Sequence, residues 1–213
     1  LNAHNIDTLI DGAHAPGMIP LNLRSLGATY YTGNCHKWLC APKGAAFLYV
    51  RRDRQPQIRP LTISHGANSP RSDRSRFWLE FDWVGTDDPT AFLSVPAAIE
   101  FMGSLLPGGW TELMETNHKL AIAARKILCD ALEIAPPCPD TMLGSLAVLP
   151  VPDGDAVALH DQLLADCAIE VPIIPWHPPG SRLIRISAQI YNQIEQYQYL
   201  ATALQAIMKF GKS

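Results

Sequence analysis

Short apolar runs rich in β-branched and aromatic residues alternate along this chain with segments of helical periodicity, and this alternation constrains the fold most. In the first part, strands are predicted at residues 6–11 ("IDTLID", taken as a buried strand), 28–33 ("ATYYTG") and 44–50 ("GAAFLYV"). The segment "NLRSLG" between the first two indicates a short helix that ends at Gly27. Strands that alternate with helices are typical of an α/β fold with crossover connections.

The second part of the chain shows the same alternation after one long helix. Between Trp110 and Leu132, apolar residues recur on one helical face, which indicates a linking helix. Beyond it the pattern predicts a strand, a helix, two strands and a final helix, at residues 143–151, 156–168, 170–176, 182–187 and from 193 onward. We therefore predict two domains, residues 1–110 and residues 111–213.

The connection between the two parts is polar at first and helical later. Residues 51–76 are rich in arginine and are predicted to form a loop. In "FDWVGTDDPT", Asp88 is placed to cap a helix whose first residue is Pro89, and this helix is expected to extend to about Leu106. Pro96 lies inside it and predicts a kink or a break.

Two residues stand at places where chemistry is common in α/β proteins. Asp11 is the last residue of the first predicted strand and precedes the loop "GAHAPG", and Lys37 follows the second strand in the crowded segment "TGNCHKWLCAPKG". In an open parallel sheet, ligands bind at the carboxyl ends of the strands. Each residue also has an ordinary interpretation, because an aspartate after a strand often forms a turn and a loop lysine is usually a solvated charge.

Taken together, the two residues match the demands of one cofactor, pyridoxal phosphate. It requires an amine that can hold its aldehyde carbon covalently and a carboxylate that keeps its pyridine nitrogen protonated. It also requires hydroxyl, backbone N–H or histidine groups around its phosphate. The segments "DGAH", "TGNCHK" and "GTDDP" contain all three kinds of group.

Four longer motifs give the chain a family likeness. "DGAHAPG", "YYTGNCHKWLCAPKG", "WVGTDDPTAFLSVPAAIEF" and "RLIRISAQIYN", in this order, resemble the class V aminotransferase branch of fold-type I pyridoxal-phosphate enzymes, and within it the isopenicillin N epimerase-like proteins. The resemblance implies that residues 1–110 are the C-terminal part of a cofactor-binding large domain with a mainly parallel sheet. Residues 111–213 would be the linking helix and a small C-terminal α/β domain. The rest of the large domain, with the residue that stacks on the cofactor ring, is expected before Leu1.

The resemblance also implies roles for individual residues. Lys37 would be the catalytic lysine that binds the cofactor covalently, and Asp11 would face the pyridine nitrogen. His14 would approach the phenolic oxygen, and Arg185 would bind the α-carboxylate of an amino-acid substrate. In the homodimer that the family implies, two of the phosphate contacts would reach the neighbouring subunit's cofactor. The phosphate contacts are Asn34 and His36 in the same subunit and Gly85 and Thr86 in the neighbouring one.

The reaction implied by this resemblance takes place at the α-carbon of an amino acid, with Lys37 as the general base. Return of the proton to the opposite face gives epimerisation, loss of a β-substituent gives a C–S lyase, and return of the proton to the cofactor gives transamination. Epimerisation needs a second acid, which the sequence does not identify. The alternative from another class is a non-catalytic fragment, and we expect residues 1–213 alone to bind the cofactor weakly or not at all.

Several of these residues also have structural alternatives. His14 could bond to the backbone of its own loop. Gly85 and Thr86 could merely prepare the helix cap at Asp88. Arg185 lies on an apolar strand, where an unpaired guanidinium is costly, so it needs either a carboxylate ligand or a structural Asp or Glu.

Two further kinds of site were considered and set aside. Cys35, His36 and Cys40 could form a zinc site with His14, but a second cysteine pair is missing, so no metal is predicted. Desulfurases of this branch carry a nucleophilic cysteine shortly before the carboxylate-binding arginine, and "EVPIIPWHPPGSRLIRIS" contains none. Cys167 lies slightly earlier, inside a predicted helix, and is expected to be a buried structural thiol.

Composition argues against other classes of partner. The net charge of −3 does not favour nucleic acid or an anionic membrane. No apolar run approaches the roughly 20 residues of a membrane-spanning helix. The five cysteines have no paired close spacing, which favours a reduced compartment, and we expect a cytoplasmic protein.

Overall fold

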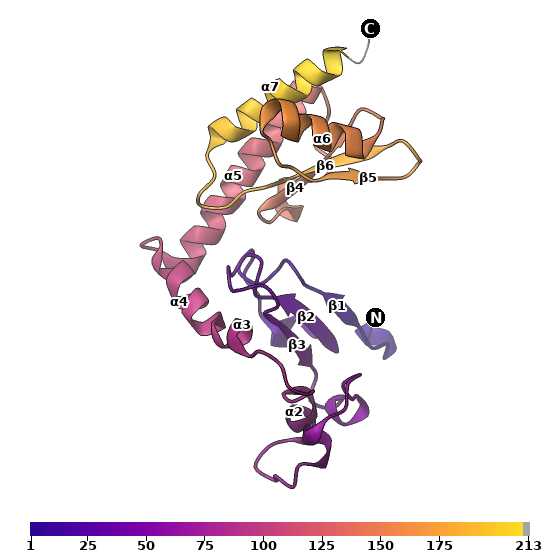
Figure 1. Ribbon diagram of the computed structural model, residues 1–213, viewed down its shortest axis with the longest axis vertical. Helices are drawn as coiled ribbons and strands as arrows, with labels where there is room; N and C mark the ends of the chain where they lie inside the picture. Colours follow the sequence, from indigo (N-terminus) through magenta and orange to yellow (C-terminus); the bar gives the residue numbers. More distant parts are fainter. Residues whose placement is uncertain (211–213) are drawn as a thin grey trace. The chain divides into compact units, whose positions relative to one another are not determined.

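The computed structural model describes residues 1–210 of the protein (Figure 1). The chain forms two compact units, Leu1–Leu105 and a second one that begins at Leu106. The sequence places this division between residues 110 and 111, inside a helix, whereas the structure places it before that helix, α5 (Gly109–Leu132), begins. The predicted α/β class is confirmed, because each unit combines helices with one sheet.

The first unit is built on a three-stranded sheet in the order β1-β2-β3. β1 (Leu9–Asp11) and β2 (Tyr30–Asn34) run parallel. β3 (Ala46–Val50) runs antiparallel to β2, because the loop between them turns the chain back on itself. The described part of this sheet is therefore mixed, with one parallel and one antiparallel pair.

The crossover between the two parallel strands contains one short helix, α1 (Leu23–Leu26), as the sequence predicts. The side chain of Asn22 accepts hydrogen bonds from two backbone N–H groups of its first turn, which caps the helix. Gly27 ends it with a φ of 67°, a left-handed conformation that glycine adopts without strain.

The prediction that the first strand is buried is wrong. The side chain of Leu9 is 67% exposed, and Ile10 is only partly buried. β1 lies at one edge of the sheet, and within residues 1–210 only β2 pairs with it. An apolar pattern indicates a strand here, but the pattern alone does not say whether neighbouring chain covers both faces.

The segment between the sheet and the long helix contains more helix than the sequence predicts. Residues 51–75 hold only 3-10 turns, in agreement with the predicted loop, but a helical turn capped by Ser75 follows and was not predicted. The helices of this unit are η1 (Asn2–His4), η2 (Gln55–Gln57), η3 (His65–Asn68), α2 (Arg76–Phe81), α3 (Thr90–Leu93) and α4 (Val95–Ser104), besides α1.

The predicted break at Pro96 is confirmed. α3 ends at Leu93 and α4 begins at Val95, with Pro96 in its first turn. Proline has no N–H to donate to the carbonyl four residues earlier, so a continuous helix would lose a hydrogen bond at this point. The helix begins one residue later than predicted, at Thr90, and Pro89 is the residue before it.

The second unit packs three helices against an antiparallel sheet in the order β4-β6-β5. Each predicted element is present. Besides α5, the elements are η4 (Asp140–Met142), β4 (Leu146–Val151), α6 (Ala156–Cys167), β5 (Ile173–Pro175), β6 (Arg182–Ser187) and α7 (Ile194–Phe210).

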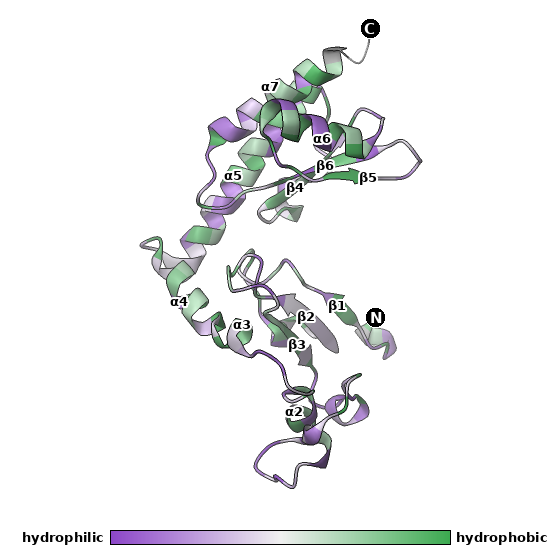
Figure 2. Ribbon diagram, in the orientation of Figure 1, coloured by the Kyte–Doolittle hydropathy of each residue, from purple (hydrophilic) through white to green (hydrophobic). Residues whose placement is uncertain are grey.

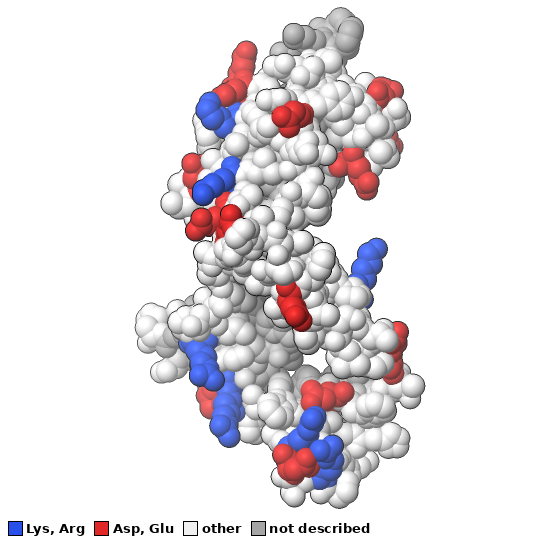
Figure 3. Space-filling model, turned by 90° about the vertical axis from the view of Figure 1, so that its left-hand side faces the viewer, with Lys and Arg blue, Asp and Glu red and all other residues white. Residues whose placement is uncertain are grey.

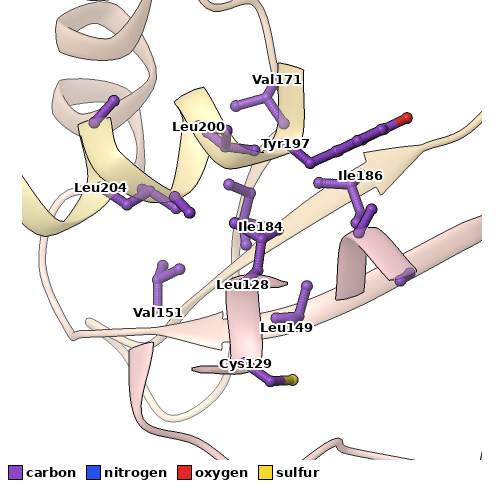
Figure 4. Packing of buried hydrophobic residues seen from close by; sticks show 14 of the residues in the cluster. Leu128, Cys129, Leu149, Val151, Val171, Ile184, Ile186, Tyr197, Leu200 and Leu204 are labelled. Carbon is purple, nitrogen blue, oxygen red and sulfur yellow. The ribbon is translucent and has the colours of Figure 1, made fainter. Parts of the chain in front are cut away.

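The core of this unit lies on one face of its sheet. Alternate residues of β6, such as Ile184 and Ile186, are buried, while Arg185 between them is partly exposed. Figure 4 shows these isoleucines meeting Leu128 of α5 and Leu200 of α7. Figure 2 shows apolar residues along the strands of this sheet, most clearly along β5. Helices thus cover one face, and Arg185 belongs to the opposite one.

Charge is distributed without a patch of one sign on the visible face. Figure 3 shows Lys and Arg interspersed with Asp and Glu, in keeping with the net charge of −3. Among the described residues, no single helix has the length and hydropathy needed to cross a bilayer.

Candidate functional site

The carboxyl ends of β1 and β2, where the sequence places Asp11 and the Lys37 loop, lie side by side. Asp11 is paired with Thr32 in the parallel register. Gly12 N donates to Thr32 O at 2.9 Å and extends the pairing by one residue. The loop that carries Asp11 and the loop that follows β2 therefore leave the sheet at the same edge.

Asp11 is exposed at the end of β1 and forms a local turn. Its Oδ1 accepts a hydrogen bond from Ala13 N at 3.0 Å, so the ordinary turn interpretation is correct for this oxygen. The neighbouring Tyr31 is buried, and its hydroxyl lies 3.5 Å from Gly12 O. Burial raises the pKa of Tyr31, and the charge of Asp11 raises it further. Tyr31 is therefore a neutral phenol beneath the carboxylate.

The Lys37 loop is held by backbone hydrogen bonds to two carbonyls, those of Ala45 and Cys35. Cys35 N and His36 N both donate to Ala45 O, at 2.9 and 3.2 Å. Ala41 N donates to Cys35 O at 3.0 Å and closes the loop from its other side. Lys37 is thus held half-buried in a loop that backbone hydrogen bonds close at both ends.

Lys37 and His14, predicted from two separate motifs, are in contact. Lys37 Nζ lies 3.2 Å from His14 Nε2. On the other side of the imidazole, Trp38 Nε1 donates to His14 Nδ1 at 3.3 Å. Gly17 allows this approach, because a Cβ on it would lie 2.8 Å from the carbonyl carbon of Trp38. The sequence reasoning gave Trp38 no role, although its position next to Lys37 was a usable signal.

The two predicted phosphate contacts of this loop lie on either side of Cys35. Asn34 is the last residue of β2 and is paired with Ala46 of β3. His36 Nδ1 lies 2.9 Å from Ala45 O, a carbonyl that can only accept, so Nδ1 carries a proton and Nε2 is the nitrogen available to a ligand. Cys35 is buried, and burial raises the pKa of its thiol.

Gly85 and Thr86 lie in the loop before α3, apart from this group. No hydrogen bond links them to Asp11, His14 or Lys37 within the described residues. Gly85 has a φ of 131°, and a Cβ on it would meet no atom within 4 Å, so the backbone is open there. Their predicted role, toward the cofactor of a neighbouring subunit, stays a prediction.

The alternative role of this loop as a helix cap has structural support. Asp88 Oδ1 accepts from Thr90 N at 2.9 Å, and this bonding lowers the pKa of the carboxyl. Asp88 thus bonds to the first N–H of α3, but it is not the capping residue that the sequence predicts, because Pro89 occupies the N-cap position.

Arg185 lies in the second unit, on the face of β6 that the helices leave uncovered. Its backbone N donates to Pro172 O at 3.1 Å, and it is paired with Val148 of β4. Its Nε is buried and has no hydrogen-bond partner among residues 1–210. The structural Asp or Glu considered as its partner is absent from the described residues. A buried guanidinium nitrogen without a partner fits an anionic ligand.

The remaining candidates do not form a further site. Cys167 is the last residue of α6 and is partly buried, somewhat less than predicted, with its side chain against the apolar core. Within residues 1–210, no three His, Cys, Asp or Glu side chains are placed to hold a metal ion.

The residues at the carboxyl ends of β1 and β2 fit pyridoxal phosphate by their chemistry. The set comprises an exposed carboxylate, an amine in contact with a histidine, and a second histidine with one ring nitrogen available. A carboxylate suits the pyridine nitrogen and an amine suits the aldehyde, while hydrogen-bond donors suit the phenolic and phosphate oxygens.

Comparison with known proteins agrees with this chemistry. A family model described as Aminotransferase class-V matches residues 1–200. Isopenicillin N epimerase of Amycolatopsis lactamdurans is 33% identical over 214 residues, which cover 95% of this chain and 52% of that protein. A probable chloroplastic L-cysteine desulfhydrase of Arabidopsis thaliana is 30% identical over 216 residues, which cover 95% and 44%. The chain thus spans about half the length of these curated relatives.

Solved structures share the fold. An apo cysteine desulfurase of Thermococcus onnurineus NA1 matches with a TM-score of 0.71 and 19% identity, covering 98% of this chain and 54% of that one. The cystine C–S lyase C-DES, in complex with cysteine persulfide, matches with a TM-score of 0.67 and 22% identity, covering 93% and 52%. A further C-DES structure holds glycine covalently linked to its pyridoxal-phosphate cofactor. The chain belongs to the class-V aminotransferase family, for which pyridoxal phosphate is the cofactor.

Proposed function

We propose that the protein is a pyridoxal-phosphate enzyme that acts at the α-carbon of an amino acid, in the manner of isopenicillin N epimerase. The observation that carries the proposal is the contact of 3.2 Å between Lys37 Nζ and His14 Nε2, at the edge of the sheet where Asp11 ends β1. Family membership supports the cofactor, and the geometry supports the residues that would hold it.

The cofactor would be held by groups from the loops that follow β1 and β2. The loop before α3 would contact the cofactor of a neighbouring subunit. Lys37 would hold its aldehyde carbon, Asp11 its pyridine nitrogen and His14 its phenolic oxygen. Pyridoxal phosphate, when bound, supplies an electron sink for negative charge that develops at the α-carbon. The groups proposed for its phosphate are Asn34, His36 and, toward a neighbouring subunit, Gly85 and Thr86.

The chain's own residues would bind the substrate and move its proton. Arg185 would bind the α-carboxylate, because a carboxylate satisfies a guanidinium with two parallel hydrogen bonds. Once the substrate's amine has replaced it at the cofactor's aldehyde carbon, the freed amine of Lys37 would take the α-proton as a general base. His14, in contact with this amine, would orient it toward the proton.

A second outcome, cleavage of a C–S bond, is favoured by a separate observation. The similarity to L-cysteine desulfhydrases, 30% over 95% of this chain, is close to the 33% found for isopenicillin N epimerase. Both outcomes start with the same proton transfer by Lys37. In epimerisation a proton returns to the opposite face of the α-carbon, whereas in C–S cleavage a β-sulfur departs. Transamination, in which the proton goes to the cofactor, is the third outcome of this chemistry.

An assay in D₂O separates the outcomes. The full-length protein, supplied with pyridoxal phosphate, would be incubated with L- and D-amino acids, cysteine and cystine, and 2-oxo acids. Deuterium at an inverted α-carbon marks epimerisation, release of sulfide or persulfide marks C–S cleavage, and a new amino acid from a 2-oxo acid marks transamination. We expect Lys37→Ala to abolish whichever reaction is found and Lys43→Ala, an exposed lysine of the same loop, to retain it. Full activity of Lys37→Ala would refute the proposal.

Two features of the assembled protein belong to the same proposal. A homodimer would bring Gly85 and Thr86 to the neighbouring subunit's cofactor, and the open space beside the backbone of Gly85 is compatible with such a contact. A cytoplasmic location is proposed from the cysteine pattern of the sequence. Sedimentation of the protein with cofactor would show whether it is a dimer.

A further inference from the structure

Trp38, His14 and Lys37 form a chain of hydrogen bonds across one imidazole ring. Trp38 Nε1 lies 3.3 Å from His14 Nδ1, and His14 Nε2 lies 3.2 Å from Lys37 Nζ. The indole is buried, with 7% of Trp38 exposed. The indole N–H of Trp38 therefore donates to a protein nitrogen, His14 Nδ1, and is largely shielded from water.

The direction of the first bond follows from the chemistry of the indole. An indole N–H is a donor only, so the nitrogen that receives it must carry a lone pair. His14 Nδ1 is then unprotonated. A neutral imidazole has one N–H, which must be on Nε2, whereas a doubly protonated ring would place N–H against N–H.

We propose that Trp38 is a positioning residue that fixes His14 in its Nε2–H tautomer, so that His14 donates a hydrogen bond toward Lys37. Lys37 Nζ can accept this bond only with the lone pair of its amine form, because an ammonium group has donors and no acceptor. The amine is the form that acts as a nucleophile or general base. The tautomer stands on the geometry alone, while its use by Lys37 rests on the proposed function.

Backbone packing around Trp38 holds its indole against the imidazole of His14. Gly17, three residues after His14, packs on the backbone of Trp38 and Leu39, where a Cβ would approach to 2.8 and 2.9 Å. Gly17 also has a φ of 81°, which disfavours other residues. The two loops thus meet at a close backbone contact that sets the indole against the imidazole.

Nitrogen-15 NMR of the histidine-labelled chain measures the tautomer directly. Two-bond couplings from the ring carbons' protons identify which nitrogen carries hydrogen, and His14→Gln identifies the His14 signals by their loss. We expect wild-type His14 to carry its proton on Nε2. We expect Trp38→Phe, which keeps an aromatic ring and loses the N–H, to give a mixture of tautomers or a doubly protonated ring. Trp78→Phe, at an exposed tryptophan of the same unit, should leave the signals unchanged.

Trace acetylation with acetic anhydride tests the consequence for Lys37. Mass spectrometry compares its labelling at neutral pH with that of Lys43, the exposed lysine of the same loop. We expect Trp38→Phe to lower the labelling of Lys37 about fivefold relative to Lys43, the equivalent of one net hydrogen bond. In a His14→Gln background, whose amide oxygen accepts and whose amide nitrogen donates in fixed roles, Trp38→Phe should change the labelling less.

The outcomes separate this inference from the proposed function. Wild-type His14 with its proton on Nδ1 would overturn the inference, even if Trp38→Phe fails to fold. Unchanged Lys37 labelling in a folded Trp38→Phe variant would overturn it as well. An Nε2–H tautomer in a protein that turns over no amino acid would refute the proposed function and leave the tautomer assignment intact.

Discussion

Arg185 offers a test in which stability and ligand binding change in opposite directions. Its Nε is buried without a partner among residues 1–210. A buried donor left unsatisfied costs about 1–3 kcal/mol. Arg185→Met keeps the apolar stem and removes the guanidinium. We therefore expect the substitution to raise the free energy of unfolding of the unliganded chain by about 1 kcal/mol.

Arg182, on the same strand, is a matched control. Its Nε donates to Pro152 O at 2.7 Å, and its Nη1 donates to Asp155 O at 2.5 Å. Burial lowers its pKa, so the guanidinium already lacks part of its hydration and depends on these bonds. Arg182→Met removes both bonds and leaves two carbonyls without these donors. We expect a loss of about 1–2 kcal/mol.

Equilibrium urea unfolding, followed by circular dichroism, measures both variants. Small domains have slopes of about 1–3 kcal/mol per molar urea, so the midpoints should move by about 0.5 M in opposite directions. In the active protein, Arg185→Met should raise the KM for an amino acid roughly 100-fold, or by about 3 kcal/mol. An equal loss of stability in both variants would refute the reasoning, because Arg185 would then have a structural partner.

A crowded glycine and a buried phenol give two more predictions. A Cβ on Gly12 would lie 1.9 Å from the Tyr31 hydroxyl, and Tyr31 is only 2% exposed. We therefore expect Gly12→Ala to destabilise the first unit by about 1–3 kcal/mol, as measured by urea unfolding. A free energy of unfolding equal to that of the wild type would contradict this. Burial, with a smaller effect of Tyr191, raises the pKa of Tyr197 from 10.0 to about 12. The unfolded chain then loses this proton at a lower pH than the folded chain. The contribution of Tyr197 to the free energy of unfolding is thus fully present below pH 10.0 and is lost as the pH rises toward about 12. Tyr197→Phe should therefore make the decline of the free energy of unfolding with pH shallower.

Sequence periodicity was sufficient for the helices and strands of the second unit, because its apolar residues recur at helical or alternating spacing and one face of its sheet is covered by its own helices. It misjudged β1, since Leu9 has the pattern of a buried strand and yet lies at an edge. It also missed the helix α2, whose capping Ser75 follows an arginine-rich stretch without apolar periodicity. Burial depends on which chain segments cover a strand, and a local pattern contains no such information.

The candidate site shows the same difference between residue type and spatial contact. The motifs identified Lys37 and His14 separately, and parallel pairing of β1 with β2 brings their loops to one edge. The contact with Trp38 could not be predicted from spacing, because it depends on the loop fold that turns the indole toward an imidazole 24 residues away. Adjacency in sequence placed Trp38 next to Lys37 but did not show which group its N–H would meet.

Three glycines allow close packing around the loops that carry His14 and Lys37. Cβ atoms on Gly12 and Gly17 would approach the Tyr31 hydroxyl to 1.9 Å and the Trp38 backbone to 2.8 Å. A Cβ on Gly33 would likewise lie 2.6 Å from the Phe47 ring. Each contact presses the loop after β1 or the end of β2 against its neighbour, at distances that any side chain would increase. Glycine at these positions therefore permits the close packing of the loops in which Lys37 Nζ lies 3.2 Å from His14 Nε2.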